Sequence, residues 1–150
     1  MKISGNRKLA SHLLLTLLVA CCGTFEIDTR VSIVDDNNPP KFKLSGNGTL
    51  IMLFVYGPFS TPEGFKSRAD EVKPVWQFGM RGPGAEIPDL PVITYGETPV
   101  GFHQQIPKQD RPPPIEEGKF YMVTPLSGSA NSKALCFTFE GGKAKTISCD

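Results

Sequence analysis

Proline and glycine interrupt the chain at short intervals after residue 20. All 14 prolines and 14 of the 15 glycines lie in residues 21–150, and together they exceed a fifth of that stretch. Both residues destabilise a helix interior, so this spacing nearly excludes long helices. Compact apolar blocks rich in strand-forming residues lie between the interruptions. That pattern is typical of short strands and tight turns, and not of a disordered chain.

The apolar blocks predict eight or nine strands. The longest block, residues 49–56 (TLIMLFVY), predicts a central strand that is buried on both faces. Asn47-Gly48 and Gly141-Gly142 are tight-turn signals, and the second predicts a two-residue hairpin turn. Residues 57–72 predict a long loop with at most one helical turn, and residues 125–133 predict a second loop. The other predicted strands are residues 30–34, 41–44, 75–78, 92–95, 101–106, 120–124, 134–140 and 143–149.

This succession of strands predicts an all-β fold, an antiparallel β-sandwich, with a small eight-stranded β-barrel as the alternative. The stretch Ile115-Glu116-Glu117-Gly118-Lys119-Phe120-Tyr121 resembles the tyrosine corner of fibronectin type III and immunoglobulin-like domains. The resemblance implies that the Tyr121 hydroxyl bonds to the main chain upstream, and that Trp76 fills the place of the buried core tryptophan. Two predicted strands follow Tyr121 where one is usual, so the strand order stays open.

The first 20 residues have the pattern of an export signal. Lys2, Arg7 and Lys8 precede an uncharged apolar run that is too short for a transmembrane helix. The tetrapeptide Leu18-Val19-Ala20-Cys21 resembles the lipobox of bacterial lipoprotein precursors. The resemblance implies cleavage before Cys21 and acylation of the Cys21 thiol with a diacylglycerol.

Three segments are expected on this basis: a lipoprotein signal peptide (1–20), a lipidated tether (21–30) and a β-sandwich domain (31–150). The alternative is an ordinary signal peptide and a soluble secreted protein, although Leu18 stands where such a cleavage site prefers a small residue. Two or more acyl chains give stable attachment to a membrane. We therefore expect the protein in the cell envelope, anchored by its lipid. In a Gram-negative cell, Cys22 after the lipid-bearing cysteine favours the outer membrane.

Cys136 and Cys149 predict a disulfide, because disulfides persist outside the cytoplasm. A two-residue turn at Gly141-Gly142 places Cys136 opposite Ile147 and diagonal to Cys149, whereas a four-residue loop places the two cysteines directly opposite. Two separately buried thiols are the alternative. No metal site is expected, because the sequence has no CxxC pair and His103 is its only histidine after residue 20.

Charge and loop aromatics narrow the range of partners. Residues 21–150 carry 13 basic and 15 acidic side chains, a net charge of −2, so no nucleic-acid surface is predicted. Phe59 and Phe65 lie in a loop and are candidate ligand contacts, because loops on a rigid scaffold often bind ligands. The alternative is that the loop folds back and caps one end of the sandwich.

The turn at residues 35–38 lacks the spacing of known calcium loops, and bonds to its own backbone explain its composition better.

No GxSxG elbow, HExxH helix or phosphate-binding loop occurs in the sequence, and no cofactor is expected. Any Ser/His/Asp relay would pass through His103, which strand alternation places opposite Phe102, Gln104 and Ile106 as a surface histidine. We expect a non-enzymatic, membrane-anchored binding or structural module whose partner is an envelope protein or a glycan. The alternatives are a small envelope enzyme that uses His103 and an accessory subunit of a larger envelope complex.

Overall fold

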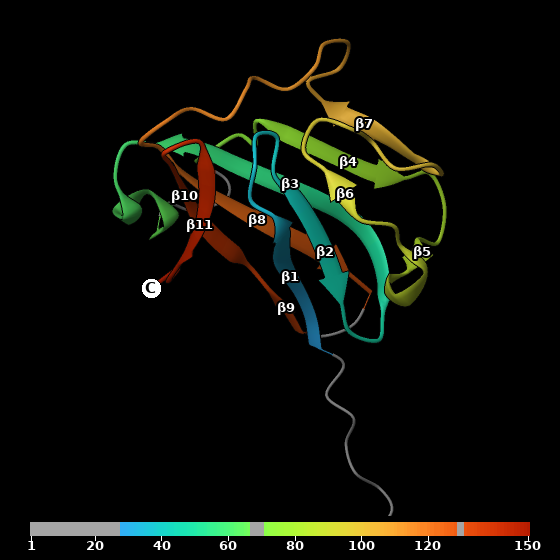
Figure 1. Ribbon diagram of the computed structural model, residues 1–150. Helices are drawn as coiled ribbons and strands as arrows, with labels where there is room; N and C mark the ends of the chain where they lie inside the picture. The colour runs from blue at the N-terminus through green and yellow to red at the C-terminus, as the bar shows by residue number, and fades with distance from the viewer. Residues whose placement is uncertain (1–27, 67–70, 129–130) are drawn as a thin grey trace, which may run out of the picture.

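Two β-sheets packed face to face make up the protein (Figure 1). The computed structural model describes residues 28–66, 71–128 and 131–150. It confirms the predicted β-sandwich, since the two sheets stay separate and do not close into a barrel within these ranges. The elements are β1 (Asp28–Asp35), β2 (Lys41–Ser45), β3 (Thr49–Phe59), the 3-10 helix η1 (Pro62–Lys66), β4 (Trp76–Met80), β5 (Ala85–Glu86), the 3-10 helix η2 (Ile87–Asp89), β6 (Ile93–Thr94), β7 (Phe102–Ile106), β8 (Phe120–Ser127), β9 (Asn131–Lys133), β10 (Leu135–Glu140) and β11 (Lys143–Ile147).

The strand order that the sequence left open is an immunoglobulin-like one with additions. The smaller sheet has the order β6-β2-β1-β9, and the larger has the order β11-β10-β8-β3-β4-β7, with β5 paired to β3. Naming β1, β2, β3, β4, β6, β8 and β10 as A, B, C, C′, E, F and G gives the sheets E-B-A and G-F-C-C′. The additions are β7 beside β4, β11 beside β10, and β9, which pairs in parallel with β1.

The central position predicted for the longest apolar block is confirmed. β3 lies between β8 and β4 in the larger sheet. The predicted burial on both faces is wrong, because Leu53 and Val55 on the inner face are buried whereas Met52 and Phe54 on the outer face are only half-buried. β8 runs beyond its predicted end and includes Pro125, although β10 pairs with it only as far as Val123. A sheet tolerates proline where a strand has such an unpaired side.

The domain starts earlier than predicted. β1 begins at Asp28, inside the segment expected to be tether, and residues 28–30 pair with β9. The Asp28 carboxylate lies 2.9 Å from the Lys133 ammonium and 3.0 Å from the Arg30 guanidinium. β9 lies in a predicted loop, and its three exposed polar residues carry no strand signal. The expected signal peptide, Cys21 and the first part of the tether lie outside the described residues.

Aromatic side chains from both sheets fill the core. Phe42 of the smaller sheet meets Phe137 of the larger sheet with ring centroids 6.0 Å apart. Tyr121 stacks on the other side of this pair, 5.3 Å from Phe137. Trp76 and Phe78 lie side by side on β4 with centroids 5.0 Å apart. All five side chains are at most 1% exposed, so they account for much of the apolar burial that holds the sheets together.

A disulfide joins Cys136 and Cys149, as predicted, with their Cα atoms 5.3 Å apart. Cys136 faces Ile147 and Glu140 faces Lys143, which is the register of the two-residue turn and not of the four-residue loop. Gly141 and Gly142 both have positive φ, at 63° and 76°. This pair of angles is the one that a tight hairpin turn requires and that glycine adopts without strain. Because Cys136 and Cys149 are bonded to each other, the alternative of two separately buried thiols is excluded.

Candidate functional site

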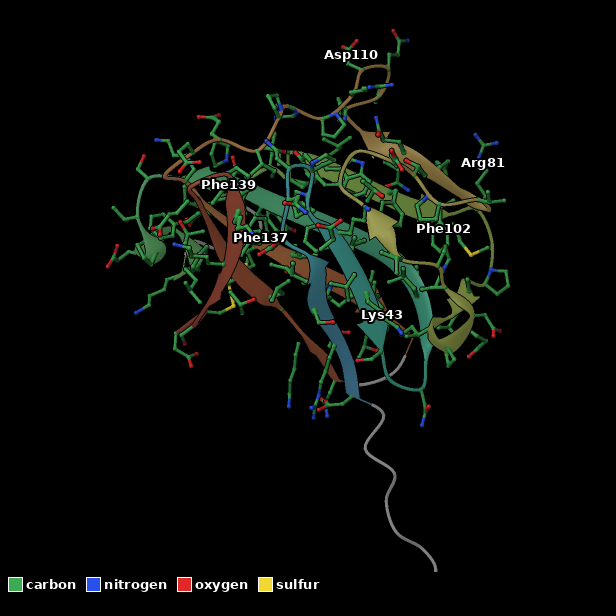
Figure 2. All side chains as sticks on the ribbon, in the orientation of Figure 1. Lys43, Arg81, Phe102, Asp110, Phe137 and Phe139 are labelled. Carbon is green, nitrogen blue, oxygen red and sulfur yellow. A yellow bond between two sulfur atoms is a disulfide. The ribbon has the colours of Figure 1, made fainter. Side chains whose placement is uncertain are left out.

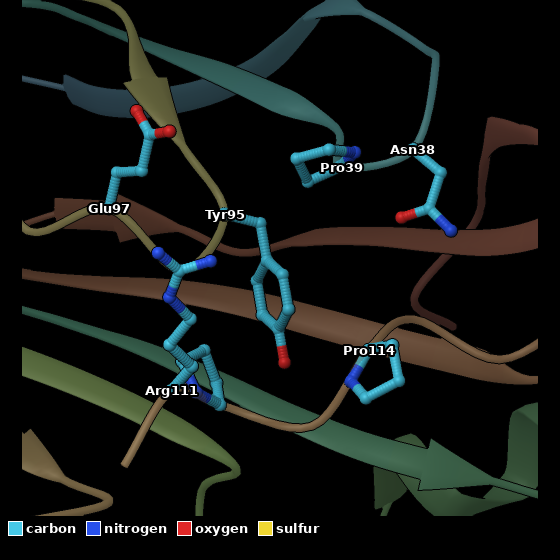
Figure 3. Close-up of a pocket in the computed structure, with 8 residues that line it drawn as sticks. Asn38, Pro39, Tyr95, Glu97, Arg111 and Pro114 are labelled. Carbon is cyan, nitrogen blue, oxygen red and sulfur yellow. The ribbon is translucent and has the colours of Figure 1, made fainter. Parts of the chain in front are cut away.

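A groove with a volume of about 470 Å³ opens at one end of the sandwich, where three segments distant in sequence meet (Figure 3). These segments are the β1–β2 turn, the residues after β6, and the connector, which we define as residues 107–119 between β7 and β8. In Figure 1 the turn and the connector lie at the top, at the end of β1 away from Asp28. The lining residues are Asn38, Pro39, Tyr95, Gly96, Glu97, Arg111, Pro112 and Pro114.

Tyr95 lies at the centre of the groove and is held from two sides. Its hydroxyl donates a hydrogen bond to the Pro113 carbonyl at 2.8 Å, and its backbone N–H donates to the Pro40 carbonyl at 3.0 Å. Burial, with a smaller contribution from nearby Tyr121, raises the pKa of the Tyr95 hydroxyl, which therefore stays protonated. Tyr95 is only 6% exposed, so its ring forms the floor of the groove and leaves little surface for a ligand.

The connector is tied to the core by Gln104. The indole N–H of Trp76 donates to Gln104 Oε1 at 3.1 Å. Gln104 Nε2 in turn donates to the carbonyls of Pro107, at 2.6 Å, and Asp110, at 2.7 Å. Figure 2 shows Asp110 at the tip of the connector. These bonds fix the backbone immediately before Arg111, so the rim of the groove is positioned by the core and not by the connector alone.

Three exposed polar side chains form the rim. Asn38, Glu97 and Arg111 make no side-chain hydrogen bond and no ion pair with any residue that the structure describes. Figure 3 shows Glu97 and Arg111 on one side of the Tyr95 ring and Asn38 on the other. A carboxylate accepts hydrogen bonds, a guanidinium donates them, and an amide does both. The rim can therefore satisfy mixed donors and acceptors on a ligand that lies across Tyr95.

Tyr121 lies where the resemblance placed it. Trp76 is buried as expected, but it lies on β4, the strand named C′ above, and not on strand C, where the core tryptophan of the resemblance lies. The backbone N–H of Glu116 donates to the Tyr121 hydroxyl at 2.9 Å, which closes the corner. Trp76 is fully buried and meets the Tyr95 ring edge-on, with centroids 5.3 Å apart. Tyr121 thus anchors the end of the connector, and Trp76 supports the floor of the groove.

Phe59 and Phe65 do not line the groove. The predicted loop position is wrong for Phe59, which is the last residue of β3, and Phe65 lies in η1. Phe65 is buried and contacts Phe59 at 5.6 Å and Phe120 at 6.4 Å between ring centroids, both edge-on. This packing matches the alternative in which the loop folds back over the sandwich, and it leaves Phe65 little surface for a ligand. Phe59 is half-buried, and its contact with a ligand stays a prediction.

His103 lies on the face of β7 that points away from the core. Its Nε2 atom is 3.3 Å from Nε2 of Gln105, and that is the only hydrogen-bond contact of the His103 side chain with the described residues.

The turn at residues 35–38 is explained by its own bonds, because the Asp35 carboxylate accepts from the backbone and side-chain nitrogens of Asn37 and pairs with Lys41. No three His, Cys, Asp or Glu side chains gather as metal ligands in the described ranges.

The groove itself was missed by sequence reasoning. Tyr95 ends a predicted strand, residues 92–95, and the residues of the connector belong to no predicted element. Asn38, Glu97 and Arg111 lie more than ten residues apart in the sequence and belong to no shared motif. Only the pairing of β2 with β6 and the hydrogen bonds of the connector bring them together.

The chain matches no family model, no curated protein and no solved structure. No helix in residues 28–66, 71–128 or 131–150 is long and apolar enough to cross a bilayer. The geometry of the groove therefore carries the functional argument.

Proposed function

We propose that this protein is a non-enzymatic binding module of the cell envelope, anchored by a lipid on Cys21 and binding its ligand in the groove around Tyr95. The observation that carries the proposal is the groove. Its position is fixed by side-chain hydrogen bonds to the connector, and its polar rim has no partner among the described residues. A preformed concave site with a few convergent polar groups is the usual form of a ligand site.

The chemistry of the lining favours binding over catalysis. None of the lining residues is a serine, cysteine, histidine or lysine, and Glu97 is the one carboxylate among them. The Tyr95 hydroxyl is bonded and neutral. Nucleophilic catalysis needs a nucleophile beside a base, and general acid–base catalysis in most glycosidases uses two carboxyl groups that flank the scissile bond. His103, the residue of the enzyme alternative, does not line the groove.

The position of the groove suits a protein tethered at its N-terminal end. β1 starts at Asp28 and leads directly into the turn that contributes Asn38 and Pro39. The groove thus lies one strand length, about 25 Å, from the place where the chain enters the domain. A lipid at Cys21 would leave the groove facing away from the membrane. The Cys136–Cys149 disulfide agrees with a compartment outside the cytoplasm.

Anchoring is tested by fractionating cells that express the full-length protein or the Cys21→Ser variant. We expect the wild type in the membrane fraction with an acylated Cys21 by mass spectrometry, and the variant as precursor or soluble protein. An acylated Cys21→Ser protein, or a wild type cleaved elsewhere without lipid, would contradict the anchor.

Ligand binding is tested by replacing Asn38 with a photo-crosslinking amino acid and irradiating intact cells. The control carries the same amino acid at Lys43, an exposed position on β2 that does not line the groove. A product formed from position 38 and not from position 43 supports the groove as the site. No product from position 38, or equal products from both positions, would overturn it.

A further inference from the structure

Resting on the function proposed above, we propose that the ligand of the groove is a neutral carbohydrate, a short oligosaccharide whose hydroxyls bind the rim and whose C–H face packs against the exposed rings of Pro39 and Pro114. Three features of the groove lead to this ligand class: the composition of its walls, the charge of its rim and its size.

The walls favour apolar C–H contact over main-chain recognition. Pro39, Pro112 and Pro114 present pyrrolidine rings and have no backbone N–H. The Pro113 carbonyl already accepts a hydrogen bond from the Tyr95 hydroxyl. Extended peptides are usually held by main-chain hydrogen bonds along a sheet edge, and the proline part of these walls cannot donate such bonds. Sugar rings, in contrast, have C–H faces that pack on apolar surfaces and need no main-chain partner.

The rim has no net charge. Glu97 and Arg111 lie on the same side of Tyr95 and carry opposite charges, and neither forms an ion pair with a described residue. An anionic ligand bound to Arg111 would lie close to Glu97, and a cationic ligand bound to Glu97 would lie close to Arg111. A neutral ligand avoids both repulsions. A sugar hydroxyl donates and accepts at once, so neighbouring hydroxyls can bind Arg111 and Glu97 together.

The size of the groove is consistent with a small ligand. A volume of about 470 Å³ lies within the usual range for small-molecule sites, roughly 300–1,000 Å³. Asn38, across Tyr95 from the charged pair, provides a second polar contact on the opposite side of the groove. An acyl chain would find no deep apolar cavity here, because the rim is polar and the groove is open to solvent.

The test is a screen of the full-length protein on an array of neutral, acidic and basic oligosaccharides, followed by titration in solution. Trp76 is the only tryptophan of the chain and contacts Tyr95, so its fluorescence reports on the groove. We expect saturable binding of at least one neutral oligosaccharide. Arg111→Ala and Glu97→Gln should each weaken that binding by about tenfold or more, as loss of a charged hydrogen bond predicts.

The matched control is Arg81→Ala, because Arg81 is an exposed arginine that does not line the groove and lies apart from the Asp110 tip in Figure 2. It should leave binding unchanged. Absence of any neutral binder, preference for charged sugars, or equal weakening by Arg81→Ala would overturn the carbohydrate class. If position 38 then crosslinks a protein in cells, the binding function stands without the carbohydrate. If it crosslinks nothing, both proposals fail.

Discussion

The hydroxyl of Tyr121 accepts a hydrogen bond from the backbone N–H of Glu116, five residues upstream, at 2.9 Å. This bond closes the end of the connector against the larger sheet, where the Tyr121 ring stacks on Phe137. It therefore links the connector, whose middle part lines the groove, to the centre of the core.

Tyr121→Phe should lower the free energy of unfolding by about 1–3 kcal/mol, because the Glu116 N–H loses its acceptor while the ring packing is kept. Urea denaturation measures the difference. Tyr56→Phe is the matched control, since Tyr56 is also buried but its hydroxyl makes no hydrogen bond with the described residues. A change below about 0.3 kcal/mol for Tyr121→Phe, equal to that of the control, would show that the corner does not stabilise the fold.

Replacing both Cys136 and Cys149 by alanine should lower the free energy of unfolding by about 3 kcal/mol, as the chain-entropy model gives for cysteines 13 residues apart. The double variant avoids leaving a single reactive thiol. Denaturation of wild type and variant provides the measurement, with non-reducing peptide mapping to establish the pairing. Free thiols at both positions in envelope-expressed protein, or a crosslink from Cys22 to either one, would contradict the disulfide.

Gly46→Ala should destabilise the fold by more than about 1 kcal/mol. Gly46 has a φ of +120°, and a Cβ atom there would lie 2.0 Å from the Asp28 carbonyl oxygen at the start of β1. Gly82→Ala is the control, because a Cβ atom at Gly82 meets nothing within 4 Å. Thermal unfolding should separate the two variants clearly. Equal melting temperatures would mean that the turn before β3 relaxes without cost.

Alkaline pH should destabilise the protein through its three tyrosines. Burial raises the pKa of Tyr56, Tyr95 and Tyr121 in the folded state, with the Glu116 N–H bond opposing the rise at Tyr121. A raised folded pKa means that the stabilisation is complete below the unfolded value of about 10 and is lost as pH rises above it. Near-ultraviolet absorbance should show less than half of the tyrosine ionised at about pH 10 while circular dichroism stays native. Half-ionised tyrosines in a folded protein at that pH would be the contrary result.

Local patterns predicted most of the fold. Period-two alternation and turn residues predicted nine of the strands and the final hairpin, although its register stayed open between two turns until the structure decided it. The tyrosine corner followed from a family resemblance in seven neighbouring residues. β5 and β9 were missed, since two and three residues are too few to show a period. Their pairing partners, Thr49–Leu50 and Asp28–Arg30, are distant in sequence.

The groove could not be predicted for a related reason. Tyr95 becomes a groove floor only because Gln104, on β7 at the edge of the larger sheet, holds the connector at Pro107 and Asp110. Amide side chains carry no sequence signal for such a role. The sequence predicted strands on both sides of the connector, at residues 101–106 and 120–124, but not which side of the connector would meet an aromatic ring.

The parallel pairing of β1 with β9 has a mechanical consequence. A membrane anchor before Asp28 and a ligand held near Asn38 would pull on opposite ends of β1. Hydrogen bonds between strands lie across the strand direction. Tension along β1 would therefore shear its bonds to β2 and to residues 131–133 together, instead of opening them one after another. Such an arrangement would let the sandwich transmit load between a membrane and whatever the groove holds.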